Sequence, residues 1–398
     1  HANPVCLRAQ LDDNIELVKT KRTGSVFREK SAPWKHSPIL GWAFDGYPIY
    51  GPYVYSDPNN AASAVKRMKS GFRLRSITAR TSIPQWTLPN HPGVNEQLTA
   101  GQYGPPVNLQ YPLGRYLEDF EYVQGLGDLD QYNGRFAVTP EYPQGTYAYH
   151  VTLDDNGNPA FPYLIGVQFY GTATGGNAQT IPNTALTYFQ NGTVVGNPQT
   201  APLLTGWLTK DSTTNARVVS SFNPSAGPAT IWPTENIWGT RTSGASATPI
   251  PAGRQTLRYT DSQVYVNSTG VASHVMGPWF DPLMAGGDFA NYPARQSYQM
   301  QLPRNPAAAQ SRTATGLGAQ GLWVNGVAVF NFLDGASYRN SAGADSGGGG
   351  AAPTMQIFSP LSWERGPVTP GSLAAGYSLF GAVLATSTET ATTAVWPT

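Results

Sequence analysis

The chain has 398 residues, of which Gly (43) and Pro (34) make up about a fifth, whereas Asp, Glu, Lys and Arg together reach only 12%. Long amphipathic helices need charged outer faces and few Gly or Pro residues, so this composition excludes a mainly helical protein. A disordered chain is also excluded, because 40% of the residues are hydrophobic and can bury a sizeable core. We therefore expect an all-β fold, a loop-rich β-sandwich or barrel-like sheets with few short helices.

The charge and the cysteine content narrow the possible partners. A formal net charge of +1 gives no reason to expect nucleic acid or an anionic membrane surface as a partner. No apolar run approaches the roughly 18 residues that span a bilayer, so we expect no membrane span. Cys6 is the only cysteine, which excludes an intrachain disulfide and a zinc site built on cysteines. The start at His1, without Met or a signal-type stretch, predicts a mature product or a fragment.

Residues 1–175 form the first segment and hold most of the unusual motifs. Two short apolar runs, 38–44 and 47–50, flank Asp45-Gly46, and this pattern predicts strand, turn, strand. Residues 57–69 (DPNNAASAVKRMK) predict one short helix, because Asp57 can cap it and Pro can occupy its first position.

Three further segments follow. Residues 176–256 are rich in Thr, Ser, Asn and Gly and contain short β-prone runs, whereas residues 257–345 have a clearer strand pattern. Within the latter, residues 321–330 (GLWVNGVAVF) predict a hairpin, because the central Asn-Gly pair is preferred in a two-residue type I′ turn. Residues 346–398 begin with a Gly-rich linker and continue as an Ala/Ser/Thr-rich tail that is too short to form a domain.

Three of the five histidines, His1, His36 and His150, lie beside aromatic, Gly and Pro positions in the first segment. Strand alternation places His150 and Tyr149 on opposite faces of one strand. Neutral imidazoles suit copper, zinc or iron(II), and neighbouring tyrosines can orient the rings. The spacings between the three histidines carry no information, so a purely structural role stays open for each.

The remaining candidates have ordinary structural roles as alternatives. Asp45 stands at an Asp-Gly turn, where its side chain can form an Asx turn instead of serving a site. We interpret His91 and His274 as loop or surface residues. The chain contains no G-x-S-x-G, no H-E-x-x-H and no phosphate-binding glycine loop, so the common hydrolase and nucleotide motifs are absent.

Four blocks of the first segment follow the order seen in a known family. They are residues 36–52 (HSPILGWAFDGYPIYGP), 127–135 (GDLDQYNGR), 139–150 (TPEYPQGTYAYH) and 161–166 (FPYLIG). In these blocks the chain resembles the YHYH proteins, which are mostly bacterial and exported and are named for a Tyr-His-Tyr-His motif. Here the motif reads Tyr-Ala-Tyr-His, so only His150 carries over. The resemblance implies an extracellular or cell-surface protein with a histidine-containing site.

The resemblance also implies an unusual order of the family's parts. Residues 1–7 (HANPVCL) look like the tail of an earlier Tyr-His-Tyr-His motif, and residues 1–175 look like the C-terminal half of the family pattern. Pieces of residues 203–331 resemble its N-terminal half, and residues 353–398 resemble the start of an acidobacterial immunoglobulin-like module. Three explanations for this order stay open. The chain is one frame of a tandem array, it is a permuted product, or the sequence has pieces missing. The first two predict that residues 257–340 complete the sheet begun by residues 1–175.

The first functional hypothesis is a metal site, with copper or another divalent metal bound by His1, His36 and His150. Asp45 and Tyr149 are expected near this site. A free α-amine on His1 would let the amine and the ring chelate copper together, which makes redox catalysis conceivable. Whether the protein is an enzyme stays open.

Two alternatives belong to other functional classes. A structural surface or filament protein would assemble as a homo-oligomer or polymer by strand exchange, through open sheet edges and the tail. A carbohydrate-binding protein would stack tryptophan side chains on the sugar rings of a polysaccharide. The candidates for this role are Trp34, Trp42, Trp232 and Trp238.

Overall fold

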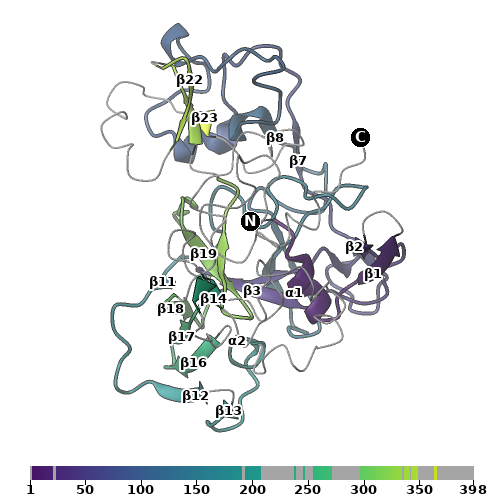
Figure 1. Cartoon of the computed structure of the whole chain (residues 1–398), viewed down its shortest axis with the longest axis vertical. Helices are drawn as coiled ribbons and strands as arrows, with labels where there is room; N and C mark the ends of the chain where they lie inside the picture. Colours follow the sequence, from purple (N-terminus) through teal and green to yellow (C-terminus); the bar gives the residue numbers. More distant parts are fainter. Residues whose placement is uncertain are drawn as a thin grey trace.

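The computed structural model describes residues 2–20, 24–190, 193–207, 237–238, 245–246, 254–270, 296–333, 336–340, 342–347 and 363–364. Most of the regular structure consists of short strands (Figure 1), and the two α-helices, α1 (Val5–Gln10) and α2 (Pro202–Thr205), are short. The described part also contains three 3₁₀ helices: η1 (Gln85–Asn90), η2 (Ala100–Gln102) and η3 (Leu117–Asp119). The all-β prediction with few short helices is confirmed, and no sheet of the described part closes into a barrel. No described helix is long and apolar enough to cross a membrane.

The helix predicted for residues 57–69 is wrong. The Asp57 carboxylate accepts a hydrogen bond from the Asn59 amide at 2.9 Å, and the Asn60 side chain accepts one from the Ala62 amide at 2.9 Å. Such local bonds offer the backbone an alternative to the helix and hold it in turns. Strand β6 (Val65–Arg67) then pairs with β5 (Tyr53–Tyr55), so the chain turns back in a hairpin instead.

The first large sheet combines strands from both ends of the described chain. Its six strands lie in the order β20–β19–β3–β4–β10–β9. In that order they are Ala328–Phe330, Ala319–Trp323, Ile39–Ala43, Pro48–Tyr50, Thr146–His150 and Gly134–Ala137. β4 and β10 are parallel, and the other neighbours are antiparallel. Residues 319–330 thus complete the sheet of residues 39–150, whereas the described strands within residues 254–303, which were predicted to join it as well, belong to another sheet. The order of the family's parts stays a prediction.

The hairpin predicted for residues 321–330 is confirmed, but its turn is of another type. The Gly326 amide donates to the Trp323 carbonyl at 2.8 Å, and only Gly326, at φ +84°, has a positive φ in this turn. This is a type I turn followed by a glycine bulge rather than a two-residue type I′ turn. The Asn325 side chain accepts the Val327 amide at 3.2 Å, which stabilises the type I conformation.

The β3–β4 hairpin has the same turn, with Gly46 at φ +85°. The two hairpins pair through β3 and β19, and equivalent positions exchange hydrogen bonds. The Phe44 amide donates to the Gln320 carbonyl at 2.9 Å, and the Val324 amide donates to the Leu40 carbonyl at 2.8 Å. Residues 39–50 and 319–330 are therefore related by a local twofold axis.

Glycines at equivalent positions of the two hairpins allow β3 and β19 to approach each other. A Cβ atom on Gly41 would lie 2.6 Å from the Leu322 carbonyl oxygen, and one on Gly321 would lie 2.3 Å from the Trp42 carbonyl oxygen. Both distances are shorter than van der Waals contact, so a larger residue at either position would push the strands apart.

A second sheet is antiparallel throughout and has the order β11–β18–β17–β16–β12–β13. These strands are Gly176–Asn177, Tyr298–Pro303, Gln263–Ser268, Arg254–Tyr259, Leu186–Gln190 and Thr193–Val194. The sheet contacts the turns of the first sheet. The Gly175 amide donates to the Phe44 carbonyl at 2.7 Å, and the Ser268 hydroxyl donates to the Gly326 carbonyl at 2.7 Å.

One hydrophobic core serves both large sheets. It contains Trp42 and Tyr149 from the first sheet and Leu257 and Met300 from the second, all nearly or fully buried. Residues from before and after position 176 therefore fold together, and the two halves of the described chain are not self-contained cores.

A smaller unit lies above this core in Figure 1, around η1 to η3. It has its own apolar cluster, consisting of Ile83, Val94, Leu98, Tyr111 and Tyr116. At its centre the fully buried Arg80 donates to both Asp119 oxygens, at 2.7 and 2.8 Å. Asp345, from the C-terminal part of the chain, joins the unit through Arg115 at 2.6 Å.

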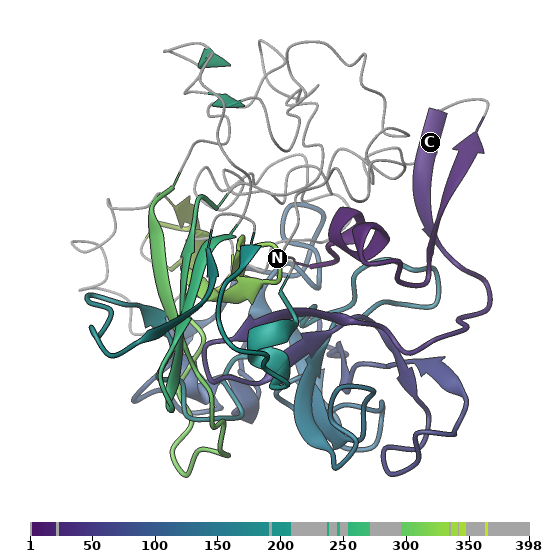
Figure 2. The same ribbon diagram turned by 90° about the horizontal axis from the view of Figure 1, so that it is seen from below.

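Short strand pairs complete the described structure, and the β1–β2 hairpin extends away from the rest of it (Figure 2). The pairs not yet given are β1–β2 (Ile15–Thr20, Gly24–Glu29), β7–β8 (Phe72–Leu74, Phe120–Tyr122) and β14–β15 (Ile237–Trp238, Ala245–Ser246). A three-stranded sheet has the order β22–β21–β23 (Ala344–Gly347, Ala336–Arg339, Trp363–Glu364). The described residues of the tail, 346–347 and 363–364, therefore pair within the chain, and strand exchange between copies stays a prediction.

Candidate functional site

The pairing of β10 with its neighbours places three polar side chains on one face of the first sheet. His150 is paired with Tyr50 on the parallel strand β4, and Ala148 is paired with Arg135 on β9. Side chains two residues apart on a strand share a face, and directly paired residues do so as well. Tyr50, Arg135 and His150 therefore face the same side, and Tyr149 faces the other.

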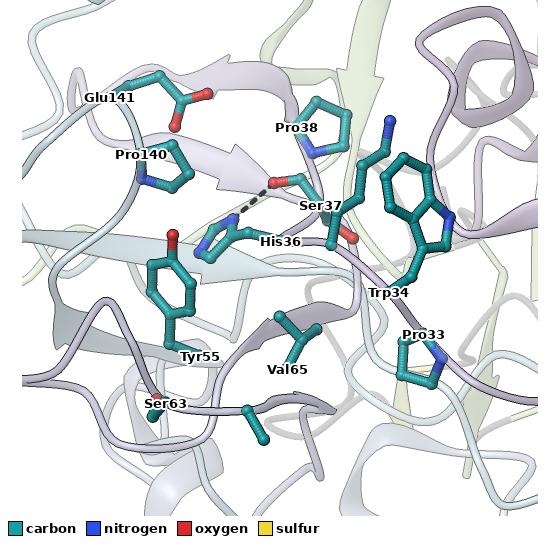
Figure 3. Close-up of a pocket in the computed structure, with 12 residues that line it drawn as sticks. Pro33, Trp34, His36, Ser37, Pro38, Tyr55, Ser63, Val65, Pro140 and Glu141 are labelled. Atoms are coloured by element: carbon teal, nitrogen blue, oxygen red, sulfur yellow. Dashed lines mark hydrogen bonds between the residues drawn. The ribbon is translucent and has the colours of Figure 1, made fainter.

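His36 lies just before β3 and has one ring nitrogen free of hydrogen bonds. Its Nδ1 lies 2.7 Å from the Ser37 carbonyl oxygen, which accepts only a hydrogen bond, so Nδ1 carries the proton. Nε2 then has a lone pair, and it is buried without a hydrogen-bond partner in the described part of the chain. The ring is 9% exposed and faces Tyr55, at 4.7 Å between ring centroids (Figure 3).

His150 is fully buried on the same side of the sheet. Only 1% of the residue is exposed, and its ring nitrogens make no hydrogen bond of ordinary geometry among the described residues, although the Gly51 backbone acts on the ring as a weak acceptor. The Tyr50 ring contacts both histidines, edge-on to His36 at 5.2 Å and stacked on His150 at 6.2 Å between centroids. The chain thus gathers two histidines about one tyrosine ring from two separate sequence blocks, residues 36–52 and 139–150.

The surroundings keep both imidazoles neutral. Burial, assisted by the positive charge of Arg135, lowers the pKa of His36 to about 4, although the Ser37 carbonyl and Asp13 oppose the shift. Burial also lowers the pKa of His150 well below its usual value, and the charges of Arg135 and His36 act in the same direction. At neutral pH each ring therefore keeps one lone pair for a ligand, on Nε2 of His36 and on one of the two ring nitrogens of His150.

A cavity of about 610 Å³ opens beside His36. Glu141 lines it and accepts a hydrogen bond from the Tyr50 hydroxyl, with 2.8 Å between the oxygens. Trp34 lines its mouth and is 60% exposed, with the Lys35 ammonium 4.5 Å from its ring centroid. The cavity thus joins a buried imidazole nitrogen to an exposed aromatic ring.

Asp45 and Tyr149 meet on the opposite face of β10 from His150. The Tyr149 hydroxyl donates to Asp45 Oδ2 at 2.5 Å, and the Gly171 amide donates to the same oxygen at 2.8 Å. Asp45 Oδ1 accepts the Tyr47 amide at 3.2 Å, so the Asx turn considered for Asp45 is present. The hydrogen bonds of Asp45 and Tyr149 thus lie on the sheet face opposite to His150, and none of them involves a histidine ring.

The other candidates are distributed as follows. His1, His274 and Trp232 lie outside the described residues, as does the side chain of Trp238. His91 lies in a loop as predicted, but the surface position is wrong, because it is 5% exposed and its Nε2 lies 2.8 Å from Glu118. Trp42 is fully buried in the core, which removes it from the carbohydrate-binding candidates.

Sequence reasoning missed Tyr50, Arg135 and Glu141. The signal was present for Tyr50, which lies in the same motif as His36, but nothing local links Arg135 to His150. No group of three or more His, Cys, Asp or Glu residues in the described part converges as a metal site requires. The described residues therefore supply two histidines and no third ligand of these types.

Comparison with known proteins identifies the part of the chain that carries this arrangement. A family model described as YHYH protein matches residues 21–161. This segment belongs to the YHYH family. It contains His36, Tyr50, Arg135, Glu141 and His150, so the whole arrangement lies within the YHYH segment, while β19 and β20 lie outside it. No curated protein and no solved structure matches the chain.

Proposed function

We propose that this YHYH-type protein is exported and binds one metal ion, copper, through His36 and His150. The observation that carries the proposal is a pair of buried imidazoles, in which Nε2 of His36 and the ring nitrogens of His150 make no hydrogen bond of ordinary geometry in the described part, so that each neutral ring keeps one lone pair for a ligand. Buried polar atoms are normally paired, and each exception calls for an explanation such as a ligand or ion. Imidazole is a preferred ligand of copper.

The hydrogen bond of His36 supports this role. Ligating histidines usually donate their second ring N–H to a carbonyl or carboxylate, which fixes the tautomer and the ring orientation. The Ser37 carbonyl accepts such a bond from Nδ1 at 2.7 Å and leaves Nε2 for the ion. Ser37 is held in turn, because its hydroxyl donates to Asp13 at 2.7 Å and accepts the Tyr53 amide at 3.1 Å.

His1 remains the proposed third ligand, and water is the other donor available. The test of the whole set is the metal content of the purified protein after loading with copper and removal of the excess. We expect about one copper ion per chain in the parent, and a loss of most of it in His36→Gln and in His150→Gln. His1→Ala should weaken binding if the third ligand is correct.

The matched control is His91→Gln, which replaces another buried histidine away from the site. It should retain the copper of the parent. Circular dichroism and thermal melting show whether each variant is folded. Equal copper content in the parent and in folded His36→Gln and His150→Gln would contradict the proposal.

Saccharide binding is a second candidate, supported by the exposure of Trp34 at the cavity mouth. Stacking of a sugar on this ring predicts that neutral oligosaccharides bind the parent and bind Trp34→Ala about tenfold more weakly, measured by titration calorimetry. Phe136→Ala is the control, because Phe136 is 61% exposed and does not line the cavity. Affinities that are the same in the parent and in Trp34→Ala would rule this candidate out.

A further inference from the structure

Two lysines flank the indole ring of Trp34 at the mouth of the cavity. The Lys30 ammonium lies 5.2 Å from the centroid of this ring, and the Lys35 ammonium lies 4.5 Å from it. Trp34 is 60% exposed and both lysines are partly exposed, so a ligand can approach the ring and the cations from solvent. The mouth therefore combines an aromatic stacking surface with two positive charges.

The charge of these lysines is available to a ligand. Lys35 forms an ion pair with Asp12 at 2.9 Å, but the Asp12 side chain is 61% exposed, and such surface pairs contribute little stability. Lys30 forms no ion pair with a described carboxylate, since the neighbouring Glu29 is paired with the buried Arg8 at 2.6 Å. A positive charge beside the ring therefore lacks a counter-charge within the described part of the chain.

The sequence around this ring adds further positive charge. Residues 15–35 contain six Lys or Arg residues and two Glu residues, which gives this segment a net charge of +4, whereas the whole chain carries +1. Strands β1 and β2 belong to this segment and extend away from the rest of the described structure (Figure 2), and only Glu16 is paired across them with a cation, Arg28. The field of the segment therefore attracts anions toward the mouth.

The inside of the cavity has a different character. Its polar lining includes Tyr55, Ser63 and the Glu141 carboxylate (Figure 3). These groups can exchange hydrogen bonds with the hydroxyls of a sugar, whereas the carboxylate repels an anion. A ligand that matches both parts has neutral hydroxyls for the inside and an acid group for the mouth. A nucleic acid or an anionic membrane, which presents phosphates throughout, matches this division of charge less well.

We propose that the mouth of the cavity binds an acidic polysaccharide, with one uronic acid unit stacked on Trp34 and its carboxylate held by Lys30 and Lys35. The inference rests on the saccharide-binding candidate and names its substrate class. It does not depend on metal binding by His36 and His150.

The experiment compares acidic and matched neutral sugars on the full chain. Titration calorimetry measures the affinity for hexamers of galacturonic acid and of mannuronic acid, and for the methyl esters of both, which keep the rings and remove the charges. We expect an acid to bind at least about tenfold more tightly than its ester, and this difference to shrink as salt is added. Equal affinities of acid and ester would overturn the inference and leave saccharide binding intact. Failure of both acids and both esters to bind would overturn the saccharide-binding candidate itself.

A hexamer of glutamic acid separates sugar recognition from attraction to any polyanion. It carries the same number of side-chain carboxylates without sugar rings, so it should bind at least about tenfold more weakly than the uronic acid hexamer. Trp34→Ala should remove most of this difference, because the indole ring supplies the stacking. Similar affinities of the parent for the two polyanions would overturn the inference, because charge alone would then account for binding.

Variants at the two lysines test their part in recognition. Lys30→Gln and Lys35→Gln should each weaken binding of the uronic acid hexamer about fivefold and leave binding of its ester unchanged. Arg73→Gln is the matched control, because Arg73 is a cation that is 57% exposed but lies on β7 and does not line the cavity. An affinity for the acid that is unchanged in both lysine variants would overturn the inference.

Discussion

Replacing Arg80 by Met should lower the free energy of unfolding of the unit around η1 to η3 by about 3–5 kcal/mol. All five N–H groups of this guanidinium are used, because it donates to Asp119 and to the carbonyls of Pro105, Tyr111 and Pro112. Removal of the arginine leaves the Asp119 carboxylate buried without its counter-charge, and this is the costly part.

Hydrogen exchange provides the measurement. Amides of residues 81–116 should lose protection in Arg80→Met, while those of the first large sheet keep it, because the unit has an apolar cluster of its own. The matched control is Arg73→Met, which removes an exposed pair with Glu121 and should cost less than about 1 kcal/mol. Similar losses of protection in the two variants would refute the central role of Arg80.

The stability of the protein should depend on the protonation of Asp45. Burial raises the pKa of this carboxyl from 3.8 to about 6, although hydrogen bonds from Tyr149, Gly171 and Tyr47 oppose the shift. Between these two values the folded state retains a proton that the unfolded state has released. The contribution of this group to stability is therefore complete below about pH 4 and is lost as the pH rises through 6.

Asp45→Asn removes this dependence, so the stability of the variant relative to the parent should increase by about 3 kcal/mol between pH 4 and pH 7. Denaturant unfolding of both proteins across this range measures the difference. Tyr149→Phe removes a donor to the carboxylate and raises the folded-state pKa, so the fall in stability should still begin near pH 4 but extend to higher pH. A stability difference between Asp45→Asn and the parent that does not change with pH would contradict the assignment.

Local patterns predicted the strands around Asp45-Gly46 and Asn325-Gly326, because a glycine turn between apolar runs specifies a hairpin without help from the rest of the chain. They failed at residues 57–69, where side chains of Asp57 and Asn60 bind nearby amides and favour turns over a helix. They placed His91 in a loop correctly, but a polar residue in a loop gives no sign that Glu118 covers it.

The candidate site was predictable only in part. His36 and His150 stand in family motifs, and the residues 21–161 that contain them match the YHYH family model. Arg135 and Glu141 belong to the same surroundings, but their place depends on how β9, β10 and β4 are aligned. A shift of one residue in either pairing would turn Arg135 or Tyr50 away from His150.

The sequence by itself determined the all-β class and the positions of the main hairpins. Its low charge and its abundant Gly and Pro disfavour long helices throughout the chain. Its glycine turns specify hairpins through neighbouring residues alone. Only the tertiary structure decided that residues 319–330 complete the sheet of residues 39–150 and that His36, Tyr50 and His150 meet beside Arg135. These contacts join residues far apart in the chain, and they depend on strand alignment and on a shared core, which no local pattern encodes.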